Sequence, residues 1–559
     1  IDVKTEKPIE LTGKLTVGSA AFRLSENTDF KINNYELVFG TDAKKCEITS
    51  GAAKNLSFLG TAGLKINFHS ASFGQGTDII GDFYSEPDVL FNCDVHAKSL
   101  TAKKDAEIHA AEINTSEKQE YFGAVTVSGA AKTKFNASAV TFLGTTDIQN
   151  ETEISATGAV AFSGNLTVAA NSPLSVSASE ATFSGAVTTS AKTGIIARSG
   201  AVKFEKPIEA GDEFSVNADS AGGSVTFADT VKFSGKTSLS SSAGHVRFGS
   251  TLETSSGAQV SVVSHSAVFE KTLTLGNELS VNADITAGSA EFKEAVNSTS
   301  KIVVSAKTAR FNSSVSAGDS VSVENAATAV FASALSAGTF ISVKSGVSTF
   351  ASSVTAANSI SVEGTEATFS GDVKVSAGGA LSVIAEKSFF RSDVNVSGEV
   401  DISGAAASVQ FDSDFISSGT SVFDADVYFS AKGKNDVEIR TEKISVGSEN
   451  SEKNLYVSAV DDAAASAKNI SWRTPADVSG NFVLLNGNIT LSNNLSGETP
   501  DISAGKDIVL LNGDSSSMYN DSVSADFNWR SDAEGIFKYS GREKKSNAVF
   551  PVAFPDGTQ

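Results

Sequence analysis

The sequence predicts an all-β fold, an elongated parallel β-helix (β-solenoid) with about 20–21 residues and three short strands per coil. Two repeating patterns predict it. Phenylalanine returns at a mean spacing of about 20.7 residues, inside the range of stacked repeat units. A pair of apolar residues separated by one serine returns between the phenylalanines at the same period. The phenylalanine column consists of Phe142, Phe162, Phe183, Phe204, Phe227, Phe248, Phe269, Phe292, Phe311, Phe331, Phe350, Phe369, Phe390 and Phe411.

The residues around each phenylalanine define the strands. Two residues before it stands Val, Ala or Ser, and four residues after it stands an aliphatic residue or Phe, with Thr146 as the one exception. Apolar and polar residues alternate in short runs bounded by Gly, Asn and Ser, which is typical of short strands between turns. The apolar pairs include Leu174/Val176, Phe214/Val216, Val260/Val262, Leu279/Val281, Val321/Val323, Ile341/Val343, Ile360/Val362 and Leu381/Val383.

Stacking follows from the small size of each repeat. A coil of some 20 residues buries too little apolar surface to be stable alone, whereas coils stacked at the ~4.8 Å strand spacing place each Phe over the next. The Val, Phe, Ser and Thr content disfavours helical repeats. We therefore expect a continuous internal phenylalanine ladder.

The regularity of the repeat divides the chain into three segments. Residues 1–120 carry similar strands less regularly and are expected to form irregular N-terminal coils or a cap, because terminal repeats cover an exposed edge. Residues 121–425 hold the regular repeats. In residues 426–559 the Phe column is lost, and we expect divergent β-coils followed by a C-terminal cap or attachment segment.

Composition disfavours some classes of binding partner and a membrane-spanning helix. The net charge of −21 and the pI of about 4.8 disfavour binding to nucleic acid. No apolar run approaches the ~20 residues of a transmembrane helix. The chain has one Met and begins at Ile1, which favours a processed, exported protein. Cys46 and Cys93 are its only cysteines, and their spacing leaves open both a disulfide and two separate thiols.

The sequence contains no phosphate-binding loop, dinucleotide fingerprint or nucleophile elbow, so we expect no enzymatic activity and no cofactor. One candidate site follows from the period. Asp372, Asp393 and Asp414 each stand three residues after a ladder Phe and are expected to form a column of carboxylates. Such a column is a candidate calcium site or an acidic pair for glycoside cleavage. The alternative, which we favour, is a turn position that prefers Asp.

Two units, Ala181-Thr-Phe-Ser-Gly-Ala-Val187 and Ala367-Thr-Phe-Ser-Gly-Asp-Val373, together with their Leu/Ile-Ser-Val partners, resemble the repeats of secreted bacterial β-helix proteins. The similarity is to the filamentous haemagglutinin and autotransporter-passenger type, and it covers residues 121–425. It implies a parallel β-helix, an extracellular or cell-surface location, and a role as a fibre or adhesin.

These observations favour a non-enzymatic extracellular structural protein, a β-helical rod that self-associates into a surface fibre, sheath or matrix. The alternative is an adhesin that binds a glycan or a host protein through one face of the β-helix. A polysaccharide lyase or hydrolase is the third hypothesis. It is disfavoured, because polysaccharide-acting β-helices tend to carry exposed Trp and Tyr along a groove. The chain has 36 Phe but only 7 Tyr and 2 Trp, and the regular repeats have almost no Tyr or Trp.

Overall fold

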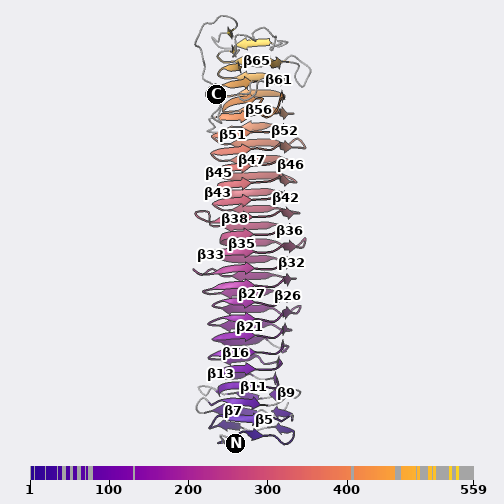
Figure 1. Ribbon diagram of the computed structural model, residues 1–559, viewed down its shortest axis with the longest axis vertical. Helices are drawn as coiled ribbons and strands as arrows, with labels where there is room; N and C mark the ends of the chain where they lie inside the picture. Colours follow the sequence, from indigo (N-terminus) through magenta and orange to yellow (C-terminus); the bar gives the residue numbers. More distant parts are fainter. Residues whose placement is uncertain are drawn as a thin grey trace. The chain divides into compact units, whose positions relative to one another are not determined.

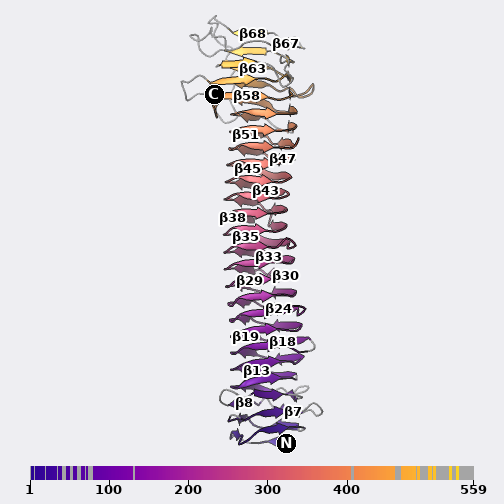
Figure 2. The same cartoon turned by 90° about the vertical axis from the view of Figure 1, so that its right-hand side faces the viewer.

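Every regular element in the described part of the chain is a β-strand. The computed structural model describes residues 2–540 apart from short gaps, and these gaps are 5–6, 19–20, 34, 41–45, 51–53, 60–64, 69–70, 74–79, 93, 130–131, 404–407, 460–467, 486–487, 492–500, 507, 512–527 and 532–536. The chain divides into two units, residues 1–283 and 284–559. Each is a parallel β-solenoid, as the sequence predicted (Figures 1 and 2). The division into segments at residues 120 and 425 stays a prediction.

In the first unit each regular coil contributes three strands, and each strand pairs in parallel with its counterpart in the next coil. One coil consists of β24 (Leu174–Ala178), β25 (Ala181–Phe183) and β26 (Val187–Thr189). It pairs with β27 (Thr193–Ala197), β28 (Ala201–Phe204) and β29 (Ile208–Ala210). The alternation of buried and half-exposed residues places the apolar side chains inside the coil and the polar ones outside.

The second unit follows the same plan. One coil consists of β47 (Ser359–Glu363), β48 (Glu366–Phe369) and β49 (Val373–Val375). It pairs with β50 (Ala380–Ile384), β51 (Lys387–Phe390) and β52 (Val394–Val396). In some coils the first two strands merge into one longer strand with a register shift, as in β43 (Val321–Phe331) and β45 (Phe340–Phe350).

The phenylalanine ladder is confirmed in both units. In the first unit stacked rings run from Tyr121 to Phe269, with ring centroids 4.7–5.2 Å apart. In the second unit the ladder begins at Phe292, and its centroids are 4.6–5.1 Å apart. It includes Phe429, one coil beyond the predicted end, stacked 5.0 Å from Phe411. Above Phe429 the column continues with Val457.

Thr146 interrupts the aliphatic column without leaving the core. It lies in β20 (Thr146–Ile148), between Val125 of one neighbouring coil and Leu166 of the other. The side chain is 2% exposed, and its hydroxyl has no hydrogen-bond partner. The polar residue is therefore held in an apolar position by the register of the coils around it.

Glycine is required at one turn position because the coils approach closely there. A Cβ on Gly164 would lie 2.2 Å from the carbonyl oxygen of Gly144, and a Cβ on Gly185 would lie 2.2 Å from that of Gly164. These distances are shorter than any real contact, so this turn accepts no side chain without a shift of the backbone.

Candidate functional site

The predicted aspartate column is present at one corner of the second solenoid. Asp372, Asp393 and Asp414 immediately precede β49, β52 and β55 (Phe415–Ser417), whose first residues pair with one another in register. The backbone carbonyls of Asp393 and Asp414 each accept a hydrogen bond from the first residue of the strand in the preceding coil, at 2.9 and 2.8 Å. The three residues therefore occupy equivalent positions in successive coils.

Each carboxylate of the column has hydrogen-bond donors from the next coil. Ser392 donates to Asp372, and the Ser413 hydroxyl donates to Asp393 Oδ1 at 2.5 Å. The backbone N–H of Asp414 also reaches Asp393 Oδ1, at 3.3 Å. Donors from serine and backbone stabilise an ionised carboxylate. This arrangement matches the turn interpretation of the column.

The last member of the column carries a counter-ion. The backbone N–H of Glu438 donates to Asp414 Oδ1 at 2.8 Å, and the Lys434 ammonium binds Asp414 Oδ2. The same ammonium lies 3.7 Å from Asp393 Oδ1. Burial lowers the pKa of Lys434, but its contacts with Asp414 and Asp393 outweigh burial and raise that pKa above the usual value. The lysine thus supplies positive charge between two carboxylates of the column.

The same turn position is used in the same way elsewhere. In the first unit, Asp105 Oδ1 accepts the backbone N–H of Ala124 at 2.8 Å, and Asn165 Oδ1 accepts that of Ala186 at 3.0 Å. Ala124 and Ala186 are the equivalent turn residues one coil later, since each precedes the first residue of its third strand. A short side-chain oxygen at this corner therefore links one turn to the next, and it does so with Asn as well as with Asp.

A buried polar cluster beside the column was not predicted from the sequence. Asp412 is 3% exposed, and its Oδ1 accepts hydrogen bonds from Gln410 and Ser430, both at 2.7 Å. Its Oδ2 pairs with the Arg391 guanidinium. The backbone N–H of Gly433 donates to the Asp412 carbonyl at 2.7 Å, so the loop of residues 431–435 folds over this corner. A buried carboxylate with this many donors is compensated for its loss of hydration.

The structure offers no further support for a metal at the column. Among the described residues, no group of three or more His, Cys, Asp or Glu side chains is arranged to hold a metal ion. Calcium binding by Asp372, Asp393 and Asp414 stays a prediction, as does their role as an acidic pair. Cys46 lies on β7 (Cys46–Ser50) and is buried, whereas Cys93 lies outside the described residues, so the disulfide also stays a prediction.

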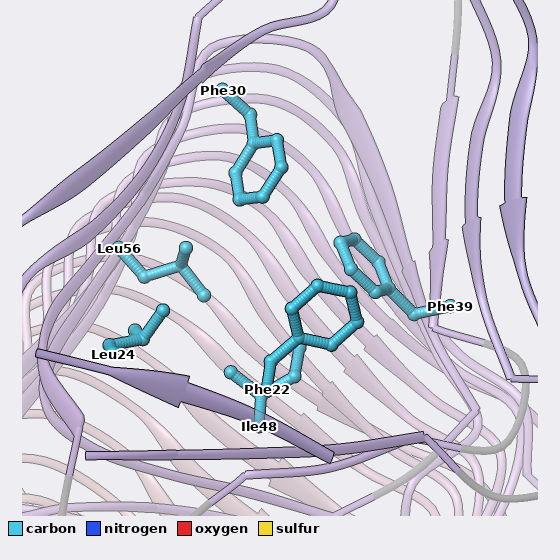
Figure 3. Close-up of a pocket in the computed structure, with 6 residues that line it drawn as sticks. All are labelled: Phe22, Leu24, Phe30, Phe39, Ile48 and Leu56. Carbon is cyan, nitrogen blue, oxygen red and sulfur yellow. The ribbon is translucent and has the colours of Figure 1, made fainter. Parts of the chain in front are cut away.

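One small apolar pocket lies among the first coils, where the aromatic residues are not stacked in a single column (Figure 3). Its volume is about 10 Å³, and its lining is entirely apolar. Phe39 meets Phe22 and Phe30 edge to face, with centroids 6.2 Å apart in each case. A cavity of this size holds at most one water, and this one offers no polar partner to it. It is a packing defect of the irregular coils.

The fold defines the chain as a parallel β-solenoid repeat protein with an internal phenylalanine ladder. Its described part contains no helix long and apolar enough to cross a bilayer. Comparison of the chain with protein-family models, curated proteins and solved structures finds no match. The similarity to secreted β-helix repeats therefore stays a prediction from the sequence.

Proposed function

We propose that this protein is a non-enzymatic structural protein of the cell exterior, a β-helical protein that self-associates into a fibre, sheath or matrix. The observation that carries the proposal is the uniformity of the coils. Successive ladder rings keep nearly the same spacing within each unit, and the outer residues of the strands are mostly small or charged. A stack of this kind repeats one surface many times, which suits a building element.

The aspartate column supports the same proposal. Its carboxylates accept hydrogen bonds from serine, backbone and lysine donors of adjacent coils, and these bonds link successive turns. The ion pairs on the outer surface also join successive coils, as in Lys192–Glu213 at 3.1 Å and Lys344–Glu363 at 3.1 Å. The polar side chains of the aspartate column and of these ion pairs hold neighbouring coils together.

Electron microscopy of the purified protein over a concentration series, with and without calcium, tests the proposal. We expect ordered filaments or sheets that appear above a critical concentration. The variant Asp393→Asn is the matched control for calcium, because asparagine keeps an acceptor oxygen at the turn but removes one charge. Isolated molecules at every concentration, in both conditions, would overturn self-assembly and favour the alternative of a glycan- or protein-binding adhesin.

A further inference from the structure

Two arginines lie one above the other on the outer surface of the second unit. Arg440 is the last residue of β58 (Asp436–Arg440), and Arg473 directly follows β61 (Asn469–Trp472) (Figures 1 and 2). The backbone N–H of Arg473 donates to the carbonyl of Ile439 at 2.9 Å, so the two arginines occupy equivalent positions in adjacent coils. Their backbones are therefore about 4.8 Å apart, a separation at which two cations repel each other unless an anion lies nearby.

One carboxylate lies between the two guanidinium groups. Glu438 Oε1 is 3.3 Å from Arg440 Nε and 3.6 Å from Arg473 Nε. Within the part of the chain that the structure describes, no other acid pairs with either arginine, so two positive charges share one negative charge. The whole chain carries a net charge of −21, so this local excess of positive charge contrasts with the acidic surface around it.

Glu438 leaves most of the hydrogen-bonding capacity of the pair unused. The Nε–H of Arg440 is buried and makes no hydrogen bond, although Glu438 is within ion-pair distance. A guanidinium group carries five N–H donors in a planar fork that fits the two oxygens of a carboxylate. The side chains of Arg440 and Arg473 are 36% and 46% exposed, so a ligand can reach them from solvent.

The neighbouring polar residues narrow the class of anion. Asp436 pairs in register with Asn469, whose Nδ2 donates to Asp436 Oδ1 at 2.7 Å, and both residues are exposed. Ser471 pairs with Glu438 and is half-exposed. Carboxylate, amide and hydroxyl oxygens such as these accept hydrogen bonds from hydroxyl groups. The acidic surface repels a densely charged polyanion, whereas a ligand with one carboxylate and many hydroxyl groups matches both the arginines and these acceptors.

An apolar side chain lies beside the arginine pair. Ile416 of β55 is the register partner of Arg440 in the preceding coil, and it is half-exposed on the same outer face. Its methyl groups can contact the C–H groups of a sugar ring while the arginines hold the carboxylate of that sugar. Sites for small ligands usually combine apolar side chains with a few polar groups that fix the orientation of the ligand.

We propose that Arg440 and Arg473 bind the carboxylate of an acidic sugar in a glycan whose other sugars are neutral. The two guanidinium groups hold the carboxylate by charge-assisted hydrogen bonds. Ile416 contacts the sugar ring, and the oxygens of Asp436 and Ser471 accept hydrogen bonds from hydroxyl groups. The inference stands on the charges and contacts of this surface and does not depend on the proposed function.

Calorimetric titration of the full-length protein with a hyaluronan tetrasaccharide, in which uronate and neutral sugars alternate, tests the site. The same tetrasaccharide with its carboxylates reduced to alcohols should bind about tenfold more weakly. Arg440→Gln and Arg473→Gln should each weaken binding of the uronate form about tenfold. Glu438→Gln should tighten it about threefold, because glutamine keeps the side-chain shape and removes the competing charge. Lys344→Gln, the matched control, removes one positive charge from a 62% exposed side chain of another coil and should change nothing.

Modification of arginine by phenylglyoxal, followed by mass spectrometry, provides the second measurement on the unmutated protein. We expect the tetrasaccharide to slow the reaction of Arg440 and Arg473 about fivefold and to leave Arg247 of the first unit, which is 51% exposed, unaffected. Absence of binding, equal binding of the carboxyl-reduced form, or unchanged binding by the arginine variants would overturn the proposal. Tighter binding of a neutral peptide with one glutamate would overturn the assignment to a sugar.

Discussion

Replacing Phe350 tests whether the aromatic ladder stabilises the solenoid beyond ordinary burial. Phe350 is fully buried and lies between Phe331 and Phe369, with centroids at 5.1 and 4.6 Å and nearly parallel rings. Truncation of a buried Phe to Ala costs about 3–5 kcal/mol. Two stacked neighbours, each contributing about 0.5–1.5 kcal/mol beyond burial, place Phe350→Ala near the upper end of that range. Phe350→Leu retains most of the apolar volume and should cost about 1–3 kcal/mol, chiefly from the lost ring contacts.

Native-state hydrogen exchange is the appropriate assay, because a long repeat array need not unfold in one step. We expect the free energy of opening to fall by these amounts for amides of β43, β45 and β48, which hold Phe350 and its two neighbours. Each coil contacts only adjacent coils, so the effect should fade within a few coils. The outward-facing variant Thr349→Ala is the matched control. A loss below about 1 kcal/mol for Phe350→Ala, or no measurable loss for Phe350→Leu, would refute the stacking argument.

Three further predictions concern single residues. Thr146→Val removes a buried hydroxyl that has no partner and should stabilise its coil by about 1 kcal/mol by hydrogen exchange, whereas a loss of protection would contradict this. Ala377 has a φ of 59°, which lies in the left-handed region that glycine adopts without strain. Ala377→Gly should therefore raise the free energy of unfolding by about 0.5–1 kcal/mol, whereas Ala356→Gly in a regular buried strand should lower it. Burial raises the pKa of Asp219, but hydrogen bonds, above all from the Ser242 backbone, outweigh it and lower that pKa. The ionised Asp219 carboxylate therefore stabilises the fold fully above about pH 3.9, and this stabilisation is lost as the pH falls through the lowered pKa. An NMR titration of the Ser242 amide with a midpoint above that pH would contradict this.

The ladder could be predicted because a parallel stack repeats one chemical environment at a fixed period. Each Phe of the column occupies the same internal position, and the next Phe follows about 21 residues later. Phe429 was missed because it follows Phe411 after only 18 residues, a shorter interval than those between the other column members. Strand pairing places Phe429 in the column, because it is the register partner of Phe411. The sequence alone does not show this pairing.

The candidate site was predicted in position but not in chemistry. The period placed Asp372, Asp393 and Asp414 in one column, as the structure shows. Their partners depend on the exact register of the turns, since a serine hydroxyl or a backbone N–H must come within about 3 Å. The Asp412 cluster depends further on the five-residue loop at 431–435. An irregular loop and residues from three coils leave no periodic signal in the sequence.

The regular pairing between coils gives the first solenoid a modular length. Because Leu166 pairs with Val187 and Phe162 stacks on Phe183, a deletion of residues 166–186 would join two equivalent turn positions. Phe162 would then meet Phe204, and every remaining strand would keep its register. Length could thus change by whole coils through duplication or loss of gene segments, with no redesign of the interior at the junction. Evolution can adjust how far such a protein extends while leaving its cross-section unchanged.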